Sequence, residues 1–416
     1  MSIKDEISRR RLLKTAGGLA LVSGLSAPSI LRAQSADVIR FGHLTPRTGF
    51  LGPLGEYGVM AADLAVEEIN AAGGVMGRKV ELLKEDSVNP QTASTKAERM
   101  IERDKVACII GEISSASCLT IAQVASRNKT LFINTGGNSD ALRGKDCQRY
   151  MFHVESQNSM YVKTVGRSFL QEGLVKGKKW YSLTADYAFG HGLQEQASRV
   201  VTENKGRVLG SVRLPVGTAD FASALLMAQS SGAKVVALAN AGNDTINSIK
   251  QAAQFGLTQG GQKLATLGGF INDVHGLGLA EAQGLTVTEA SYWDTNDATR
   301  AWSKTFFDKV KAMPNMLQTG TYSSVRHYLK AVAAAKTDAS AAVMDAMRAS
   351  IVDDIFYRGG RIRPDGRMVH AMNLYEVKTP AESKAPWDYY KLLATTSGDQ
   401  AFRPIEASTC ALVNRR

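Results

Sequence analysis

The sequence predicts an α/β protein built on doubly wound, mostly parallel sheets, and two observations carry this prediction. Short apolar segments alternate with longer amphipathic ones as far as about residue 290, which is the order of strands and helices around a parallel sheet. The alternation restarts near residue 158, so two α/β units of similar size follow one another. Because 416 residues suffice for two domains of ordinary size, we expect two lobes.

The first α/β unit opens with a strand over 38–44, which ends in a glycine-rich turn. The helix after this turn places Val59, Ala62 and Val66 on one face and ends at paired glycines. The unit continues with strands over 79–83, 106–110 and 131–134 and with helices over 92–103 and 119–127.

The second α/β unit repeats the alternation. Its predicted helices are 158–170, 192–204, 221–229, 241–255 and 274–281, and its predicted strands are 179–183, 207–213, 234–239, 264–267 and 285–289. Three helices follow with little strand between them, over 298–311, 321–335 and 341–350. Because these helices exceed what the second sheet needs, we expect some of them to cover the first lobe. Last, the Pro-Asp-Gly turn within 361–367 predicts a hairpin.

Composition and charge exclude several classes of protein. With 44% hydrophobic and 21% charged residues, the chain has the composition of a soluble globular protein. Its formal net charge is +11, but the basic residues are interspersed with acidic ones, as over 98–105, so we expect no nucleic-acid partner. No segment after residue 33 is apolar over the length that spans a membrane.

The N-terminus carries an export signal. Arg9, Arg10 and Arg11 precede an apolar run over 16–30, and Ala33 supplies a small residue for cleavage. Adjacent arginines before such a run are typical of a twin-arginine signal peptide, so we assign 1–33 to a signal that is removed on export to the periplasm. An uncleaved anchor is the alternative, but the run is shorter than the ~20 residues that span a bilayer. The mature chain would carry a formal charge of +7.

The titratable residues form no recognisable catalytic or metal-binding motif. The six histidines are isolated from one another and from the four cysteines, so we expect no metal and no enzyme activity. The turn with Gly49, Gly52 and Gly55 has the spacing GxxGxxG in place of the dinucleotide fingerprint GxGxxG, so we expect no cofactor. A periplasmic enzyme is the alternative, and it would use as catalyst a serine or His191, which follows a strand and opens a helix.

The turn over 111–117 is the strongest candidate for a binding element. An apolar strand ends at Gly111, and small hydroxyl residues lead into the next helix. The free amides and the positive end of the helix dipole at such a turn favour an anionic group, to which Ser115 and Ser117 would donate hydrogen bonds. The alternative is that Ser114 and Ser115 only cap the helix.

Four more strand-to-helix turns carry small polar or aromatic residues. Ligands of open α/β sheets bind beyond the carboxyl ends of the strands, so five such turns from both units would line one cleft between two lobes. The alternative is that each turn is an ordinary solvated loop. The candidate ligand-binding residues in these turns are Ser115, Ser117, Gly136, Asn138, Tyr187, Phe189, Asn243 and Phe270.

Several motifs resemble the periplasmic solute-binding proteins for branched-chain amino acids, and the resemblance covers essentially the whole mature chain. It implies a two-lobed type I periplasmic binding fold with three crossovers. It also implies closure around a small-molecule ligand and delivery of that ligand to an inner-membrane ABC permease. The motifs are the strand opening over 41–44 with Thr48-Gly49, the helix end over 65–75 with Gly77, and the segments over 109–111, 186–190 and 364–366.

The resemblance also implies roles for single residues. In the amino-acid binders the ligand carboxylate meets a serine, matched here by Ser115, and groups at the next turn, matched by Gly136 and Asn138. An aromatic wall matches Phe189. Where those proteins place a glutamate against the ligand's ammonium, this sequence places Phe270. Because a buried ammonium without a partner is costly, we expect an aromatic or other carboxylate that lacks an α-ammonium.

Two alternatives to this function stay open. A branched-chain amino acid or an amide would fit if Asp244 supplied the missing negative charge, and a ligand-sensing module for a signalling partner would have the same fold. We expect a monomer.

The resemblance finally implies a disulfide and a division into lobes. Cys147 and Cys410 match cysteines of some members of this group, and a bridge from Cys118 to Cys147 is the alternative. We place lobe 1 at 37–154 plus 289–357, lobe 2 at 155–288 plus 358–390, and a C-terminal tail at 391–416.

Overall fold

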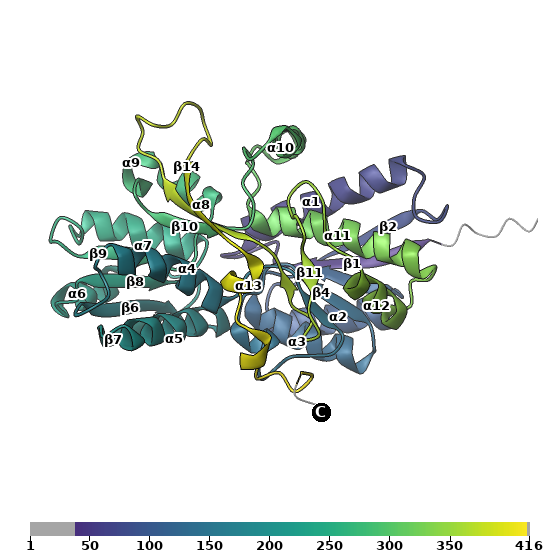
Figure 1. Ribbon diagram of the computed structural model, residues 1–416, viewed down its shortest axis with the longest axis horizontal. Coiled ribbons are helices and arrows are strands. Elements are labelled where there is room, and N and C mark those ends of the chain that lie inside the picture. The colour runs from purple at the N-terminus through teal and green to yellow at the C-terminus, as the bar shows by residue number, and fades with distance from the viewer. Residues whose placement is uncertain (1–37, 414–416) are drawn as a thin grey trace, which may run out of the picture. The chain divides into compact units, whose positions relative to one another are not determined.

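The computed structural model describes residues 38–413, which contain two parallel sheets (Figure 1). The predicted signal peptide, 1–33, lies outside the described residues. None of the helices within 38–413 combines the length and the apolar character needed to cross a membrane.

The five-stranded sheet has the order β2-β1-β3-β4-β5, and all neighbouring strands are parallel. Strands and helices alternate along the chain as the sequence predicts. Strand β5 is not among the predicted strands, because its three residues are too few to show a pattern. The bounds are β1 Ile39–Thr45, α1 Gly52–Ala71, β2 Val80–Asp86, α2 Pro90–Glu102, β3 Cys108–Gly111, α3 Ser115–Arg127, β4 Leu131–Asn134 and β5 Met151–His153.

Successive residues of this sheet face two different cores, because side chains alternate along a strand. Ile110 and Phe152 belong to a core with α1 and the late helix α11 (Met316–Ala335). Ile109 and Met151 belong to a core with α2 and α3. Helices therefore cover both faces, which explains why the central strands β3 and β4 are buried along their whole length.

The four-stranded sheet has the order β7-β6-β8-β9 and is also parallel (Figure 1). Val235 and Ala237 share a core with α4 and α5, whereas Val236 and Leu238 share one with α6 and α7. The bounds are α4 Asn158–Gln171, β6 Lys179–Ala185, α5 Ala188–Glu203, β7 Arg207–Leu214, α6 Ala222–Ser230, β8 Val235–Ala239, α7 Asn243–Gln254 and β9 Lys263–Thr266.

The helix predicted over 274–281 is two helices in the structure, so that prediction is wrong. Helix α8 (Ile271–Leu277) ends at Gly278, and α9 (Leu279–Ala282) follows it. Gly278 has a φ of +84°, a left-handed conformation that glycine adopts without strain and that a continuous helix does not contain.

A third, antiparallel sheet joins β10 (Thr286–Glu289), β13 (Met372–Val377) and β14 (Tyr390–Thr396) in the order β10-β13-β14. Strands β13 and β14 are missing from the predicted elements. Because β14 continues to Thr396, the first residues of the expected C-terminal tail, 391–416, lie in a strand.

The predicted hairpin is confirmed as β11 (Arg361–Ile362) and β12 (Met368–Val369). Arg367 forms a bridge with His153 at the end of β5. The segment 358–390, which we assign to lobe 2, therefore begins with a hairpin that one isolated bridge links to the end of β5.

The late helices are α10 (Asp297–Val310), α11 and α12 (Ser340–Ala349). Helices α10 and α11 pack on α1, and α12 packs on α11 (Figure 1). This confirms the expectation that late helices return to the first lobe. The chain leaves the five-stranded sheet after β5, returns after β10 to the helices that pack on α1, and leaves them again before β13, which gives three passages between the lobes.

Candidate functional site

A small cavity lies at the carboxyl ends of strands from both parallel sheets. The turns after β1, β3 and β4 contribute to it from the first sheet, and the turns after β6, β8 and β9 contribute from the second. Its volume of about 20 Å³ is the space of about one water molecule. The lining residues are Leu51, Leu54, Ile113, Gly136, Asn138, Tyr187, Phe189, Ala241, Phe270 and Leu317.

Five of the predicted residues line this cavity, namely Gly136, Asn138, Tyr187, Phe189 and Phe270. They come from three separate turns, which the sheet topology brings together. The expectation that turns from both halves meet in one place agrees with this arrangement.

The turn after β3 is organised by Glu112, which is fully buried and has a φ of +65°. Its Oε1 atom accepts hydrogen bonds from the amides of Ile113 at 3.0 Å and Ser114 at 2.7 Å. Burial raises the pKa of this carboxyl to about 7, although the amide bonds act in the opposite direction. The protein's own carboxyl thus takes two amides that we expected to be free for an anion.

Ser115 and Ser117 are buried, and neither of them lines the cavity. The Ser115 Oγ atom accepts a hydrogen bond from the Ser139 amide at 3.1 Å, which ties the turn after β3 to the turn after β4. The capping alternative is wrong for Ser114, because its side chain makes no capping bond although it occupies the N-cap of α3.

The turn after β4 is closed on itself. The amides of Gly136 and Gly137 both donate to the Asn134 Oδ1 atom, at 3.0 and 2.8 Å. Asn138 faces the cavity, and its Nδ2 atom donates to the Tyr161 hydroxyl at 3.4 Å. The Asn138 Oδ1 atom is buried and has no hydrogen-bond partner among the described residues. The lining residue Asn138 therefore carries one unpaired hydrogen-bond acceptor, its side-chain oxygen.

Aromatic rings form one wall of the cavity. Tyr187 contacts Phe50 with a ring-centroid distance of 5.8 Å and Phe189 with one of 5.9 Å. Phe50 follows β1 and Tyr187 follows β6, so these rings join the two sheets. Burial and the nearby Asp244 carboxyl raise the pKa of the Tyr187 hydroxyl, which stays neutral.

Asn243 does not reach the cavity, because it is exposed at the first position of α7. Its neighbour Asp244 is buried, and its Oδ2 atom accepts a hydrogen bond from the Gly217 amide at 3.1 Å. Burial raises the pKa of Asp244 to about 6. Asp244 is absent from the cavity lining, so the cavity wall carries no charged side chain.

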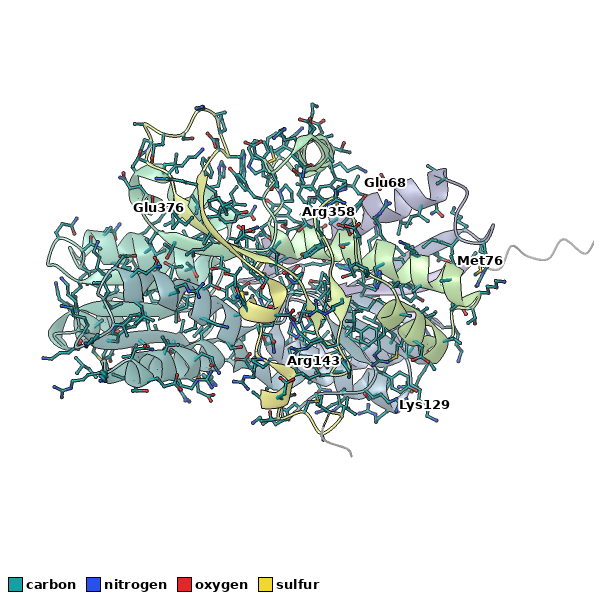
Figure 2. The ribbon with its side chains drawn as sticks, viewed as in Figure 1. Glu68, Met76, Lys129, Arg143, Arg358 and Glu376 are labelled. Atoms are coloured by element: carbon teal, nitrogen blue, oxygen red, sulfur yellow. A yellow bond between two sulfur atoms is a disulfide. The ribbon has the colours of Figure 1, made fainter. Side chains whose placement is uncertain are left out.

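A larger hollow of about 600 Å³ lies between α1, α11 and the segment 351–358, where Figure 2 labels Met76 and Arg358. Two of its cations are paired, since Arg326 bonds to Glu68 at 2.8 Å and Arg358 lies 3.3 Å from Asp353. None of the turns at the carboxyl ends of the parallel strands lines this hollow, and we therefore take the smaller cavity as the candidate site.

The structure shows no arrangement for catalysis or metal binding within 38–413. No group of three potential metal ligands occurs among these residues. The His191 Nε2 atom lies 2.6 Å from Asp186 Oδ1, and no serine or cysteine in this range hydrogen-bonds to the ring. A disulfide joins Cys147 and Cys410, whereas Cys108 and Cys118 are free and buried, so the alternative bridge from Cys118 to Cys147 is absent.

A family model described as periplasmic binding protein matches residues 38–384 of this chain. The chain belongs to this family. Membership agrees with the prediction that the protein is not an enzyme. The match to curated Leu/Ile/Val-binding protein homologues of Brucella abortus, 30% identical over 267 residues, spans 62% of this chain and 64% of theirs.

Solved structures share the fold of this binding protein over nearly their whole length. A periplasmic binding protein from Burkholderia mallei is 42% identical, covers 91% of this chain and 99% of its own, and has a TM-score of 0.86. A branched chain amino acid ABC transporter periplasmic ligand-binding protein from Burkholderia xenovorans LB400 is 33% identical, covers 90% and 100%, and has a TM-score of 0.78.

A solute binding protein of an ABC transporter from R. palustris, in complex with benzoate, is 20% identical. It covers 90% of this chain and 100% of its own with a TM-score of 0.76, which shows the shared fold alone. The predicted type I periplasmic binding fold is confirmed by the two parallel sheets and by these structures.

Sequence reasoning missed the aliphatic half of the binding protein's cavity, which consists of Leu51, Leu54, Ile113, Ala241 and Leu317. Four of these residues lie in or beside strand-to-helix turns noted in the sequence analysis. Their position directly after a strand could therefore have identified them as cavity residues. Leu317 begins a late helix, and no local pattern places it at the end of a distant sheet.

Proposed function

We propose that this chain is the substrate-binding protein of an ABC importer and that its cavity binds a small organic carboxylate without an α-ammonium group. The observation that carries the proposal is the uncharged lining of the cavity. The lining residues include no aspartate or glutamate, and three of the lining residues are aromatic.

The cavity gives the ammonium group of an amino acid no counter-charge, and the unpaired Asn138 Oδ1 atom would be a neutral acceptor for it. Phe270, 5% exposed, stands at the turn where a carboxylate is expected in amino-acid binders, and its amide donates to Asp273 at 2.9 Å. The Asp273 carboxyl is thereby turned to the backbone of its own helix. Taking an ammonium group out of water without a counter-charge costs several kcal/mol, so leucine and valine are disfavoured.

A carboxylate would find donors at the edge of the five-stranded sheet. The Ser115 hydroxyl stands in the first turn of α3, where the helix dipole favours negative charge. In the bond with the Ser139 amide the Ser115 Oγ atom is the acceptor, so this bond does not use the hydroxyl hydrogen that would be donated to a carboxylate. Binding would enlarge a cavity that now has the volume of one water molecule.

The benzoate that the R. palustris protein holds supports an aromatic carboxylate as the first compound to test. The names of the Burkholderia xenovorans and Brucella proteins favour a branched-chain amino acid as the second candidate. Under that candidate, Asp244 would have to turn from the Gly217 amide toward the cleft.

We propose further features that follow from this role. The chain is exported by the twin-arginine route with cleavage near Ala33, acts as a monomer in the periplasm and delivers its ligand to an inner-membrane permease. Its lobes are those given above, with the hairpin 361–369 moved to the first. A sensor that passes closure to a signalling partner is the alternative use of the same fold.

A thermal-shift and calorimetric titration of the mature protein tests the proposal with benzoate, 4-hydroxybenzoate, leucine and valine. A ligand at about one hundred times its dissociation constant stabilises by about 2.7 kcal/mol, which raises the melting temperature by several degrees. We expect this rise with an aromatic acid and none with leucine or valine.

The variant Phe270→Ala serves the same titration, since it removes one aromatic wall and should weaken aromatic-acid binding at least tenfold. The control is Leu226→Ala, because Leu226 is an exposed residue of α6. Stabilisation by leucine or valine alone would overturn the proposed ligand class and leave the binding-protein role in place.

A further inference from the structure

One buried carboxyl group joins helix ends that belong to the two different sheets. Glu289, the last residue of β10, is 1% exposed. Its Oε1 atom accepts hydrogen bonds from the Ile271 amide at 3.0 Å and the Tyr390 hydroxyl at 2.8 Å. Its Oε2 atom accepts one from the Met316 amide at 3.0 Å.

The two amides bound by Glu289 are the first of their helices. Ile271 begins α8, which follows β9 of the four-stranded sheet, and Met316 begins α11, which packs on α1 beside the five-stranded sheet. One carboxyl group, at the end of β10, therefore binds the start of a helix beside the four-stranded sheet and the start of a helix beside the five-stranded sheet.

Each of these amides adjoins a residue of the cavity. Phe270 precedes Ile271 and Leu317 follows Met316, and both side chains line the cavity from the two sides. The distance between these two walls is consequently tied to the two bonds that Glu289 accepts.

Side-chain amides support the same junction. Asn315, the N-cap of α11, donates from its Nδ2 atom to the Asn272 Oδ1 atom at 2.6 Å. Asn272 in turn donates to the Met313 carbonyl at 3.1 Å. The starts of α8 and α11 are thus in direct contact, and Glu289 lies beneath that contact as the group shared by both backbones.

We propose that Glu289 is a positioning residue of the binding site, which clasps the first turns of α8 and α11 and thereby sets the gap between Phe270 and Leu317. The clasp holds the two helix ends as they lie in the present structure, and separation of the lobes releases at least one of the two amide bonds. This inference rests on the proposed function for its effect on affinity, but not for its structural part.

The structural part is tested by hydrogen exchange of the ligand-free mature protein, followed by mass spectrometry of peptides over 270–275 and 315–320. Glu289→Gln keeps the size of the side chain. It replaces one carboxylate oxygen, an acceptor, by an NH₂ group, a donor that cannot accept a hydrogen bond from the backbone N–H it faces. We expect exchange to rise about 10- to 100-fold in both peptides, because the hydrogen bonds to a buried carboxyl are lost.

The matched control is Asp273→Asn, which weakens a cap of α8 alone, since among residues 38–413 the Asp273 carboxyl accepts a hydrogen bond only from the Phe270 amide. We expect this variant to raise exchange over 270–275 and to leave 315–320 unchanged. If Glu289→Gln raises exchange at one helix end only, or at neither, the clasp is overturned.

A measurement on the unaltered protein keeps the inference testable if Glu289→Gln does not fold. A shared clasp predicts that the amides of Ile271 and Met316 exchange through one opening event, with protection factors equal within about threefold. Protection that differs by more than tenfold between these amides would overturn the clasp.

The functional part uses benzoate as the probe. Saturating benzoate should slow exchange at both helix ends of the unaltered protein, and Glu289→Gln should bind benzoate about tenfold more weakly. If benzoate does not bind the unaltered protein, the proposed ligand class fails while the exchange data still decide the clasp. If Glu289→Gln binds benzoate with unchanged affinity, the positioning role is overturned.

Discussion

Single residues decide how much space the cavity offers, and Gly136 is the clearest case. A Cβ atom at this position would lie 2.5 Å from Ile113 Cγ2 and 3.0 Å from Leu317 Cδ2, and both of these residues line the cavity. The absence of a side chain at Gly136 is therefore part of the shape of the site. Packing density leaves no room for an added methyl without a shift of these neighbours.

Gly136→Ala is expected to destabilise the protein by about 1–3 kcal/mol, because the new methyl overpacks the turn. It should also weaken aromatic-acid binding at least tenfold, because Ile113 and Leu317 are pushed into the space of the ligand. Urea unfolding and calorimetry measure the two effects. Ser114→Ala is the control, since its side chain makes no capping bond, and it should change stability by less than about 0.5 kcal/mol. Equal affinity of Gly136→Ala and the unaltered protein would contradict the prediction.

At the scale of elements, the sequence was informative where structure is local. Alternating strand and helix patterns predicted nine strands and most helices, because burial on both faces makes a parallel strand uniformly apolar. The turns that end those strands could be named for the same reason, and Gly136, Asn138, Tyr187, Phe189 and Phe270 follow from them.

The elements that were missed depend on partners far along the chain. Strand β14 exposes Leu392 and Leu393 and pairs only with β13, so its pattern does not show a buried face. Leu317 reaches the cavity because α11 packs on α1, more than 200 residues earlier in the chain. Likewise, Ser115 and Asn243 were chosen for their place after a strand, but a hydrogen bond to Ser139 holds the first and solvent surrounds the second.

A disulfide and a set of hydrogen bonds fix the segments around Asp365 and Cys410 to the part of the chain near β5. The disulfide from Cys147 to Cys410 closes a span of 263 residues. Arg143, labelled in Figure 2, is buried and donates hydrogen bonds to the carbonyls of Met151, at 2.8 Å, and Asp365. The short helix η1 (Asp140–Arg143) therefore joins β5, the hairpin turn and the chain end.

Replacing both cysteines, Cys147→Ser with Cys410→Ser, is expected to lower the free energy of unfolding by about 2–5 kcal/mol. The loss should be accompanied by faster hydrogen exchange over 402–413, because the segment keeps only non-covalent contacts. Urea unfolding and exchange mass spectrometry measure these changes. Cys108→Ser with Cys118→Ser is not a suitable control, since both residues are buried, so the reduced unaltered protein serves instead. Stability that is the same with and without reductant would contradict the prediction.

At the scale of the whole molecule, the crossovers between the sheets contain buried ionisable groups. Glu155 follows β5 and accepts a hydrogen bond from the Tyr357 hydroxyl, while its Oε2 atom has no hydrogen-bond partner among the described residues. Burial raises the pKa of Glu155 to about 8, against the attraction of Arg367, and Glu289 adds to the rise. Burial likewise raises the pKa of Glu289, although the three hydrogen bonds that this carboxyl accepts act in the opposite direction. The Glu155 carboxyl, whose Oε2 atom is unpaired, therefore holds a proton in the folded state at pH values where the unfolded chain has lost it.

The free energy of unfolding is expected to fall as pH rises from about 6.5 to 8. A carboxyl with a raised pKa stabilises the fold fully below its unfolded value near 4.5, and this contribution is lost as pH rises toward the folded value of about 8. The buried His43 and His370 have pKa values lowered to about 4, so they favour the folded state increasingly as pH rises through their unfolded value of about 6.5, which opposes the carboxyl slope until about pH 7.5. A variant that lacks one carboxyl group shares this histidine contribution with the unaltered protein, so the difference between their slopes isolates that carboxyl group.

Glu155→Gln should flatten this slope by up to about 1.4 kcal/mol per pH unit, because a glutamine binds no proton in either state. Urea unfolding at pH 6.5, 7, 7.5 and 8 measures the slope. The control is Glu376→Gln, since Glu376 lies at the surface of β13, where Figure 2 labels it, and its side chain is 40% exposed. If Glu155→Gln and the unaltered protein lose stability equally with pH, Glu155 is ionised in the fold, and its charge must then be balanced by Arg367 across the crossover.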